Sequence, residues 1–136
     1  MKLIEWNIHK MTNDIPVQQF VVDALVKMDA DIICLVEYLT DKGIVAALER
    51  DYWLEESNSI SGNKVFIAVK KKIASCGIVT VKKDEIVGCY NFLHIDFINN
   101  EGEKLSIIGV RMLSPINAKK QTPPLVKYIK RLENTY

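Results

Sequence analysis

The chain has 136 residues, of which 49% are hydrophobic and 26% charged, and its net charge is +1. This composition is typical of a soluble domain with room for a hydrophobic core, and it carries no strong charge that would indicate a nucleic-acid or membrane partner. No apolar run approaches the ~20 residues that a membrane span needs. The three cysteines form no CxxC pair, which favours a reducing, cytoplasmic setting.

The first segment with a clear pattern is residues 3–9, Leu-Ile-Glu-Trp-Asn-Ile-His. Its alternation predicts a strand with Ile4, Trp6 and Ile8 on one face. Asn7 and His9 then lie on the other face, at the C-terminal end of the strand. Open α/β sheets usually keep their chemistry at this end.

A helix and a second strand are predicted next. Residues 13–16, Asn-Asp-Ile-Pro, form a helix-entry signal, and apolar residues follow at helical spacing: Val17, Phe20, Val21, Ala24, Leu25 and Met28. The apolar run 31–37 predicts a strand that ends on Glu37. A strand–helix–strand unit of this length favours two parallel strands with a right-handed crossover. Asn7 and Glu37 are therefore expected at the same edge of one sheet.

The rest of the chain predicts a short helix, an antiparallel β region and a last helix. The helix covers residues 41–50, and a brief strand at 52–56 precedes a polar loop at 57–63. Four β-rich segments follow, at residues 64–70, 76–81, 90–98 and 105–112, with a hairpin turn at 99–102. Thr122-Pro123-Pro124 introduces the last helix, whose apolar face is Leu125, Tyr128, Ile129 and Leu132.

The first two strands carry a family resemblance. The motif Trp6-Asn7-Ile8-His9, followed by a helical segment and residues 29–37 (Asp-Ala-Asp-Ile-Ile-Cys-Leu-Val-Glu), resembles the opening of the endonuclease/exonuclease/phosphatase superfamily. The resemblance implies an α/β fold, and the predicted element order matches the first half of that family's two-sheet sandwich. The family's later Asp-x-Asn and Asp-His motifs do not occur in these residues. We therefore expect residues 1–136 to form a single partial domain that lacks the C-terminal half.

The resemblance also implies a metal site. Asn7 and Glu37 match the family residues that help to hold a catalytic Mg²⁺ (or Mn²⁺), although Val36 stands where the family usually has Gln. Carboxylate and amide oxygens are ligands that Mg²⁺ prefers. The alternative interpretation is structural, with Asn7 capping a turn and Glu37 lying at a solvated strand end.

Two further residues match positions near the substrate in this family. His9 is expected to hydrogen-bond a phosphate oxygen or a metal-bound water, and the alternative is a histidine satisfied by the backbone. Arg111, placed with a one-residue uncertainty, is expected to clamp a phosphate, and the alternative is an ion pair at a strand end. At neutral pH arginine cannot serve as a general acid.

His94 and Asp96 alternate onto one face of a predicted strand, which suggests a catalytic dyad. No motif ties a Ser or Cys nucleophile to them, so we expect an exposed sheet face instead.

Taken together, these residues predict a Mg²⁺-dependent phosphohydrolase fragment that acts on a phosphodiester and is inactive in isolation. Its substrate contains phosphate, and the sequence leaves open whether this is a nucleic acid or a small phosphoester. The competing interpretation is a non-catalytic binding or assembly module that self-associates as a homo-oligomer, because half a sandwich leaves strand edges open.

Overall fold

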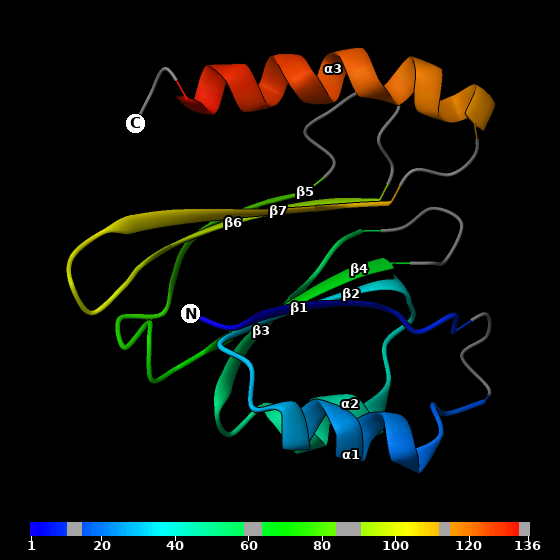
Figure 1. Cartoon of the computed structure of the whole chain (residues 1–136), viewed down its shortest axis with the longest axis vertical. Coiled ribbons are helices and arrows are strands. Elements are labelled where there is room, and N and C mark those ends of the chain that lie inside the picture. The colour runs from blue at the N-terminus through cyan, green and yellow to red at the C-terminus, as the bar shows by residue number, and fades with distance from the viewer. Residues whose placement is uncertain (11–14, 59–63, 84–90, 112–114, 134–136) are drawn as a thin grey trace.

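The computed structural model describes residues 1–10, 15–58, 64–83, 91–111 and 115–133, with the backbone alone for residues 115–123. The described chain folds into four layers: two helices, a first sheet, a second sheet and a last helix (Figure 1). None of the described helices is long and apolar enough to span a membrane.

The first sheet has the strand order β1-β2-β4-β3, with β1 at Leu3–Asn7, β2 at Ile32–Tyr38, β3 at Tyr52–Glu56 and β4 at Lys64–Lys70. β1 and β2 are parallel, as the crossover rule predicts, and β4 pairs antiparallel with both β2 and β3. The helices α1 (Gln19–Met28) and α2 (Lys42–Leu48) cover its outer face. This confirms the predicted β-α-β-α order.

The second sheet is an antiparallel meander of β5 (Ile78–Lys83), β6 (Phe92–Ile98) and β7 (Lys104–Val110). β4 does not join this meander, because it lies between β2 and β3 in the first sheet. The inner faces of the two sheets form one core, in which Ile67, Leu93 and Phe97 are fully buried. The two-sheet α/β sandwich predicted from the sequence is therefore present.

The last helix, α3, runs from Pro115 to Glu133 and so begins earlier than the sequence predicts. Proline is suited to the first turn of a helix, because its missing N–H needs no partner there. A proline inside a helix costs about 3 kcal/mol, yet the helical backbone continues through Pro123 and Pro124. Packing of the C-terminal part of α3 on the outer face of the second sheet offsets this cost, through Leu125, Tyr128 and Leu132.

The helix α1 begins later than the sequence predicts. Gln18 is still extended, with a ψ angle of 144°, and the helix starts at Gln19. The backbone N–H of Val17 donates to Asp41 Oδ2 at 2.9 Å, so the segment before α1 is tied to the start of α2. Asn13 and Asp14, which belong to the predicted helix-entry signal, lie outside the described residues.

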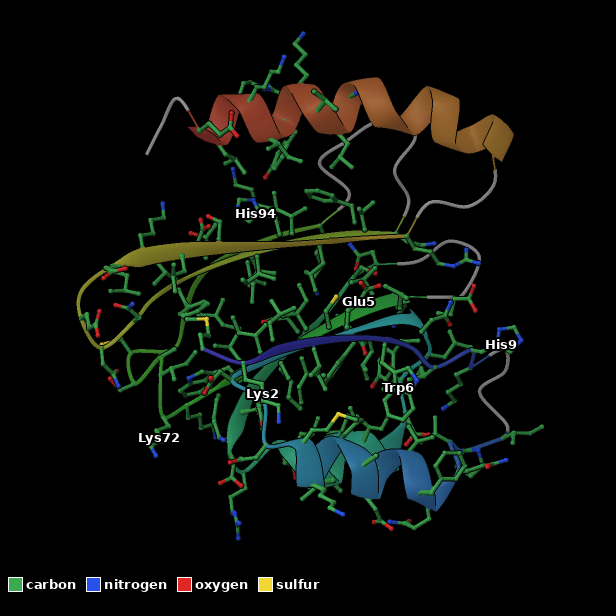
Figure 2. The ribbon with its side chains drawn as sticks, in the orientation of Figure 1. Lys2, Glu5, Trp6, His9, Lys72 and His94 are labelled. Carbon is green, nitrogen blue, oxygen red and sulfur yellow. The ribbon has the colours of Figure 1, made fainter. Side chains whose placement is uncertain are left out.

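His94 and Asp96 are buried, so the expectation of an exposed sheet face is wrong. The two residues are 1% and 4% exposed, because α3 covers this face of β6 (Figure 2). His94 Nε2 lies 2.8 Å from Asp96 Oδ1, and His94 Nδ1 is hydrogen-bonded to the Tyr128 hydroxyl. The pair therefore helps to anchor α3.

Candidate phosphate and metal site

The candidate site lies where β1, β2 and β7 end. Asn7 is aligned with Val36 in the parallel pairing of β1 and β2, so Asn7 and Glu37 come to the same edge of the first sheet. The backbone pairing continues past β1, since Ile8 N–H donates to Val36 O and Lys10 N–H to Glu37 O. The predicted meeting of Asn7 and Glu37 at one edge is present in the structure.

A β-bulge turns Glu37 towards the second sheet. Between Leu35 and Tyr38, β2 has one residue more than the paired segment of β4. Leu35 and Tyr38 both pack in the core beneath the helices, although simple alternation would place them on opposite faces. Glu37 takes up the extra step with a φ angle of 51°, in the left-handed region that non-glycine residues rarely occupy.

Glu37 meets Arg111, which comes from the other sheet. Gly109 on β7 faces the first sheet, because a Cβ at that position would lie 2.5 Å from Val65 Cγ1. Arg111 is two residues further on and projects the same way. Its Nε and Nη2 atoms donate to Glu37 Oε1 at 3.2 and 2.8 Å. The two side chains are only 19% and 14% exposed, so this ion pair is largely sheltered from water.

His9 contacts the other oxygen of the same carboxylate. Its Nδ1 lies 2.8 Å from Glu37 Oε2, and its side chain is 74% exposed. His9 also has a left-handed backbone, with a φ angle of 49°, and its N–H donates to Asn7 Oδ1 at 3.0 Å. Two residues with strained backbone therefore stand side by side, a feature that is concentrated at functional sites.

These contacts keep Glu37 ionised. Hydrogen bonds from Arg111 and then from His9 are the main causes that lower the pKa of Glu37 from its ordinary 4.5 to about 2, against a smaller opposing effect of burial. The positive charge of Arg111 and a hydrogen bond from Asn7 act in the same direction. An ionised carboxylate can bind a cation or hold a neighbouring cationic donor in place.

The four residues predicted from the sequence thus form one cluster, in which two of the alternative structural roles are also present. Asn7 caps the turn to His9, and Arg111 forms an ion pair at a strand end. These contacts leave hydrogen-bonding capacity on Glu37 and Arg111, because a carboxylate has about four lone-pair positions and a guanidinium has five N–H donors.

A divalent cation fits part of this donor set. Glu37 supplies an ionised carboxylate and Asn7 an amide oxygen, which suits Mg²⁺ when water or a phosphate completes its coordination. Among the side chains that the structure describes, no group of three or more His, Cys, Asp or Glu residues is gathered as a metal centre. The guanidinium of Arg111 is a competing cation at the same carboxylate.

Three residues near this cluster were not predicted from the sequence. Lys10 and Asp41 form a buried ion pair of 3.0 Å that joins the end of β1 to the start of α2. Asn91 O accepts a backbone hydrogen bond from Arg111 N–H, and among the described residues no hydrogen-bond partner is found for its buried side-chain amide. Such an amide usually binds a water or a ligand. Only Asp41 carried a sequence signal, as a helix N-cap.

Comparison with known proteins gives matches among solved structures only. The sequence matches no protein-family model and no curated protein. The crystal structure of ANGEL2, a 2′,3′-cyclic phosphatase, superimposes with a TM-score of 0.72 and 13% identity, over 96% of this chain and 47% of that one. TDP2 from C. elegans superimposes with a TM-score of 0.66 and 14% identity, over 98% of this chain and 42% of that one. Humanized D. rerio TDP2 superimposes with a TM-score of 0.70 and 16% identity, over 95% of this chain and 54% of that one.

This chain therefore shares the fold of ANGEL2 and TDP2. It spans about half the length of these structures, in agreement with the half sandwich predicted from the sequence. The shared fold, together with the edge at which Asn7, His9, Glu37 and Arg111 meet, is the basis for a functional proposal.

Proposed function

We propose that this chain is the metal- and phosphate-binding side of a Mg²⁺-dependent phosphohydrolase domain that acts on a phosphodiester. The observation that carries the proposal is the convergence of His9 and Arg111 on the ionised carboxylate of Glu37. The fold shared with ANGEL2 supports it, because ANGEL2 is described as a 2′,3′-cyclic phosphatase.

The side chains of the cluster are suited to a phosphate. Arg111 is held in a fixed orientation by two bonds to Glu37, and guanidinium donors recognise phosphate oxygens in pairs. His9 is exposed next to it, and because its Nδ1 donates to Glu37, its Nε2 can donate to a phosphate only in the imidazolium form. A phosphate bound here would be oriented by Arg111 and His9, while Glu37 holds both residues in position.

The proposed cofactor is Mg²⁺ or Mn²⁺, with Glu37 and Asn7 as its protein ligands. Such an ion, when bound, would polarise a phosphoryl oxygen and stabilise charge on the leaving oxygen. Turnover by this chain alone is expected to be low, because its 136 residues contain neither an Asp-x-Asn nor an Asp-His motif.

The substrate class remains a phosphate ester, either nucleic acid or a small molecule. ANGEL2 is described as a 2′,3′-cyclic phosphatase and has a structure in complex with adenosine-2′,3′-vanadate, so a nucleotide phosphate is the first candidate to test. A cytoplasmic location is part of the proposal, since Cys34 and Cys76 are free thiols.

Isothermal titration with phosphate and with Mg²⁺ or Mn²⁺ tests the proposal on the purified chain. We expect Glu37→Gln to abolish metal binding, and the exposed turn variant Glu101→Gln to retain it. Arg111→Gln should weaken phosphate binding by about tenfold, the value of one charge-assisted contact, and should strengthen metal binding by removing the competing cation. Failure of the wild-type chain to bind either ion at millimolar concentration would refute the site.

An assembly module is the second candidate function. It is favoured by the open edges of the described sheets: β1 and β7 are both terminal strands, and Leu3 on β1 is 55% exposed. Unpaired strand edges of this kind are templates for pairing with another chain. Light scattering that gives a dimer mass would support self-association, and a monomer mass across the micromolar range would contradict it.

A further inference from the structure

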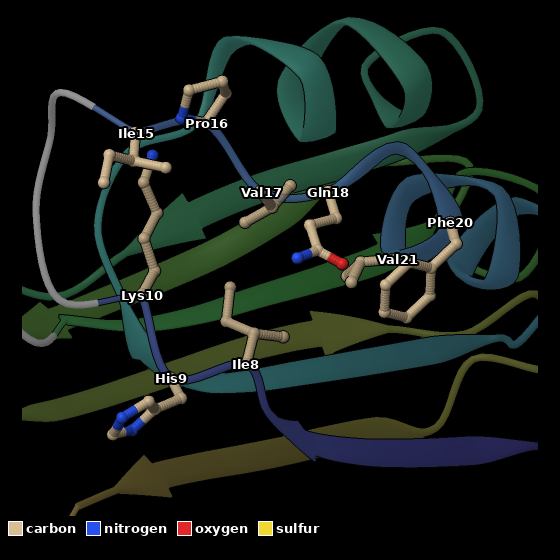
Figure 3. Close-up of a pocket in the computed structure, with 9 residues that line it drawn as sticks. All are labelled: Ile8, His9, Lys10, Ile15, Pro16, Val17, Gln18, Phe20 and Val21. Carbon is tan, nitrogen blue, oxygen red and sulfur yellow. The ribbon is translucent and has the colours of Figure 1, made fainter.

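The ion pair of Glu37 and Arg111 has an outer side and an inner side. His9 lies on the outer side: its side chain is 74% exposed, and its ring points away from Phe20 on α1 (Figure 3). On the inner side Arg111 lies next to Asn91, which directly precedes β6. Because Asn91 is only 1% exposed, the inner side is closed to solvent.

Asn91 and Arg111 are neighbours on adjacent strands, and their side chains point to the same face of the second sheet. The pairing of Phe92 with Val110 continues one residue further, since Arg111 N–H donates to Asn91 O at 3.1 Å. Residues that lie directly opposite each other on antiparallel strands share a face of the sheet. Gly109, two residues before Arg111, faces the first sheet, so Arg111 and Asn91 face it too.

The side-chain amide of Asn91 is buried without a protein partner. Among the described residues, no hydrogen bond is made to its Oδ1 atom or to its Nδ2 atom. An unpartnered amide in a core is costly, and most buried amides bond either to protein or to an ordered water. Asn91 therefore has the properties of a residue that holds a small polar molecule.

Arg111 has further donors next to this amide. Of the five N–H groups of a guanidinium, Arg111 uses the one on Nε and one on Nη2 to bond Glu37 Oε1. Its side chain is only 19% exposed, so the remaining N–H groups are largely sheltered from bulk water. A partner for them on the inner side would hold the guanidinium from a second direction.

The two groups together select a molecule that both donates and accepts. The Oδ1 atom of Asn91 is an acceptor, and the guanidinium of Arg111 is a donor only. No direct bond joins them, because Glu37 orients the guanidinium. A water molecule can donate to Oδ1 and accept from Arg111 at once, and buried waters make about three hydrogen bonds of this kind.

We propose that Asn91 holds a buried water molecule that accepts a hydrogen bond from Arg111, which makes Asn91 a positioning residue for the guanidinium. With Glu37 on one side and the water on the other, the guanidinium keeps one orientation before a phosphate arrives. Asn91 acts through Arg111 and does not contact the phosphate itself. The proposal deepens the proposed function and rests on it for the effect on phosphate affinity.

NMR spectra of the whole chain test the water and the orientation directly. Wild-type protein should give a cross-peak between water and the side-chain amide of Asn91, and separate Nη1 and Nη2 signals for Arg111. Asn91→Leu, which has a similar shape without polar atoms, should merge the two Nη signals. Asn100→Leu is the matched control and should keep them separate, because its amide bonds Lys72 O and Ser75 Oγ in another part of the fold.

Urea denaturation separates this role from a simple packing defect. If Asn91 held no water, Asn91→Leu would remove an unpartnered amide, raise the urea midpoint and leave the Arg111 signals unchanged. That result would overturn the proposal. A wild-type spectrum without the water cross-peak would also overturn it, and this measurement does not depend on the folding of any variant.

Titration with inorganic phosphate distinguishes the failure of this proposal from the failure of the proposed function. We expect Asn91→Leu to bind phosphate about fivefold more weakly than wild type, the value of one neutral hydrogen bond, and Asn100→Leu to bind it equally well. Unchanged affinity in Asn91→Leu would overturn the positioning role and leave the phosphate site intact. If the wild-type chain binds no phosphate, the proposed function fails, and the Arg111 signals still decide whether Asn91 orients the guanidinium.

Discussion

Arg111 donates two hydrogen bonds to a single oxygen of Glu37, although 74 positions separate the two residues in the chain. Arg111 follows the last strand of the second sheet, and Glu37 sits in a bulge of the first sheet. The contact therefore links the two sheets at the edge where the candidate site lies. It also fixes the charge state of Glu37, whose pKa falls to about 2.

Arg111→Gln should lower the free energy of unfolding by about 1–3 kcal/mol, because a sheltered carboxylate loses its charged partner. Urea denaturation measures this change. Arg50→Gln is the matched control: Arg50 pairs with Asp51 at 3.4 Å, but its side chain is 89% exposed, so its loss should cost less than about 0.5 kcal/mol. Equal losses in the two variants would contradict a special role for the Arg111 pair.

The stability of the fold should depend on pH through Glu37. The pKa of Glu37 is about 2 in the folded chain and close to 4.5 when unfolded, so the unfolded chain binds the proton first. The stabilisation is complete above pH 4.5 and is lost as the pH falls towards 2. Wild-type protein should therefore lose more free energy of unfolding across this window than Glu37→Gln does. Parallel curves for the two proteins would show that Glu37 is not linked to folding.

Gly109→Ala should destabilise the sandwich by about 1–3 kcal/mol through overpacking between the sheets. The added Cβ would lie 2.5 Å from Val65 Cγ1, and Val65 is fully buried. Combining it with Val65→Ala removes the clash, so the double variant should lose less stability than the sum of the single variants. Simple additivity in chemical denaturation would argue against this close approach of β7 to β4.

Tyr128→Phe should weaken the docking of α3 by about 1–2 kcal/mol, because the buried Nδ1 of His94 loses its donor. Asp96 accepts from Nε2, so His94 is expected to carry its proton there and to use Nδ1 as the acceptor. Long-range nitrogen–proton NMR spectra of the imidazole report this tautomer directly. A proton on Nδ1 in the wild-type chain would contradict the arrangement.

The sequence by itself determined the element types and the parallel start of the first sheet, and its family resemblance implied the half-sandwich class. The element types and the parallel pair follow from local patterns, such as the alternation in residues 3–9 and the apolar run that ends at Glu37, which any fold of this chain must bury. The sequence also placed Asn7 and Glu37 at one edge, because parallel strands bring their C-terminal ends together.

Only the tertiary structure decided which way the side chain of Glu37 points and whether His94 and Asp96 are exposed. Alternation alone would turn Glu37 towards the helices, and the bulge between Leu35 and Tyr38 turns it to Arg111 instead. Likewise, α3 buries His94 and Asp96, which the strand pattern left on an open face. Bulges and helix docking depend on packing between segments far apart in the chain, and local periodicity carries no information about such packing.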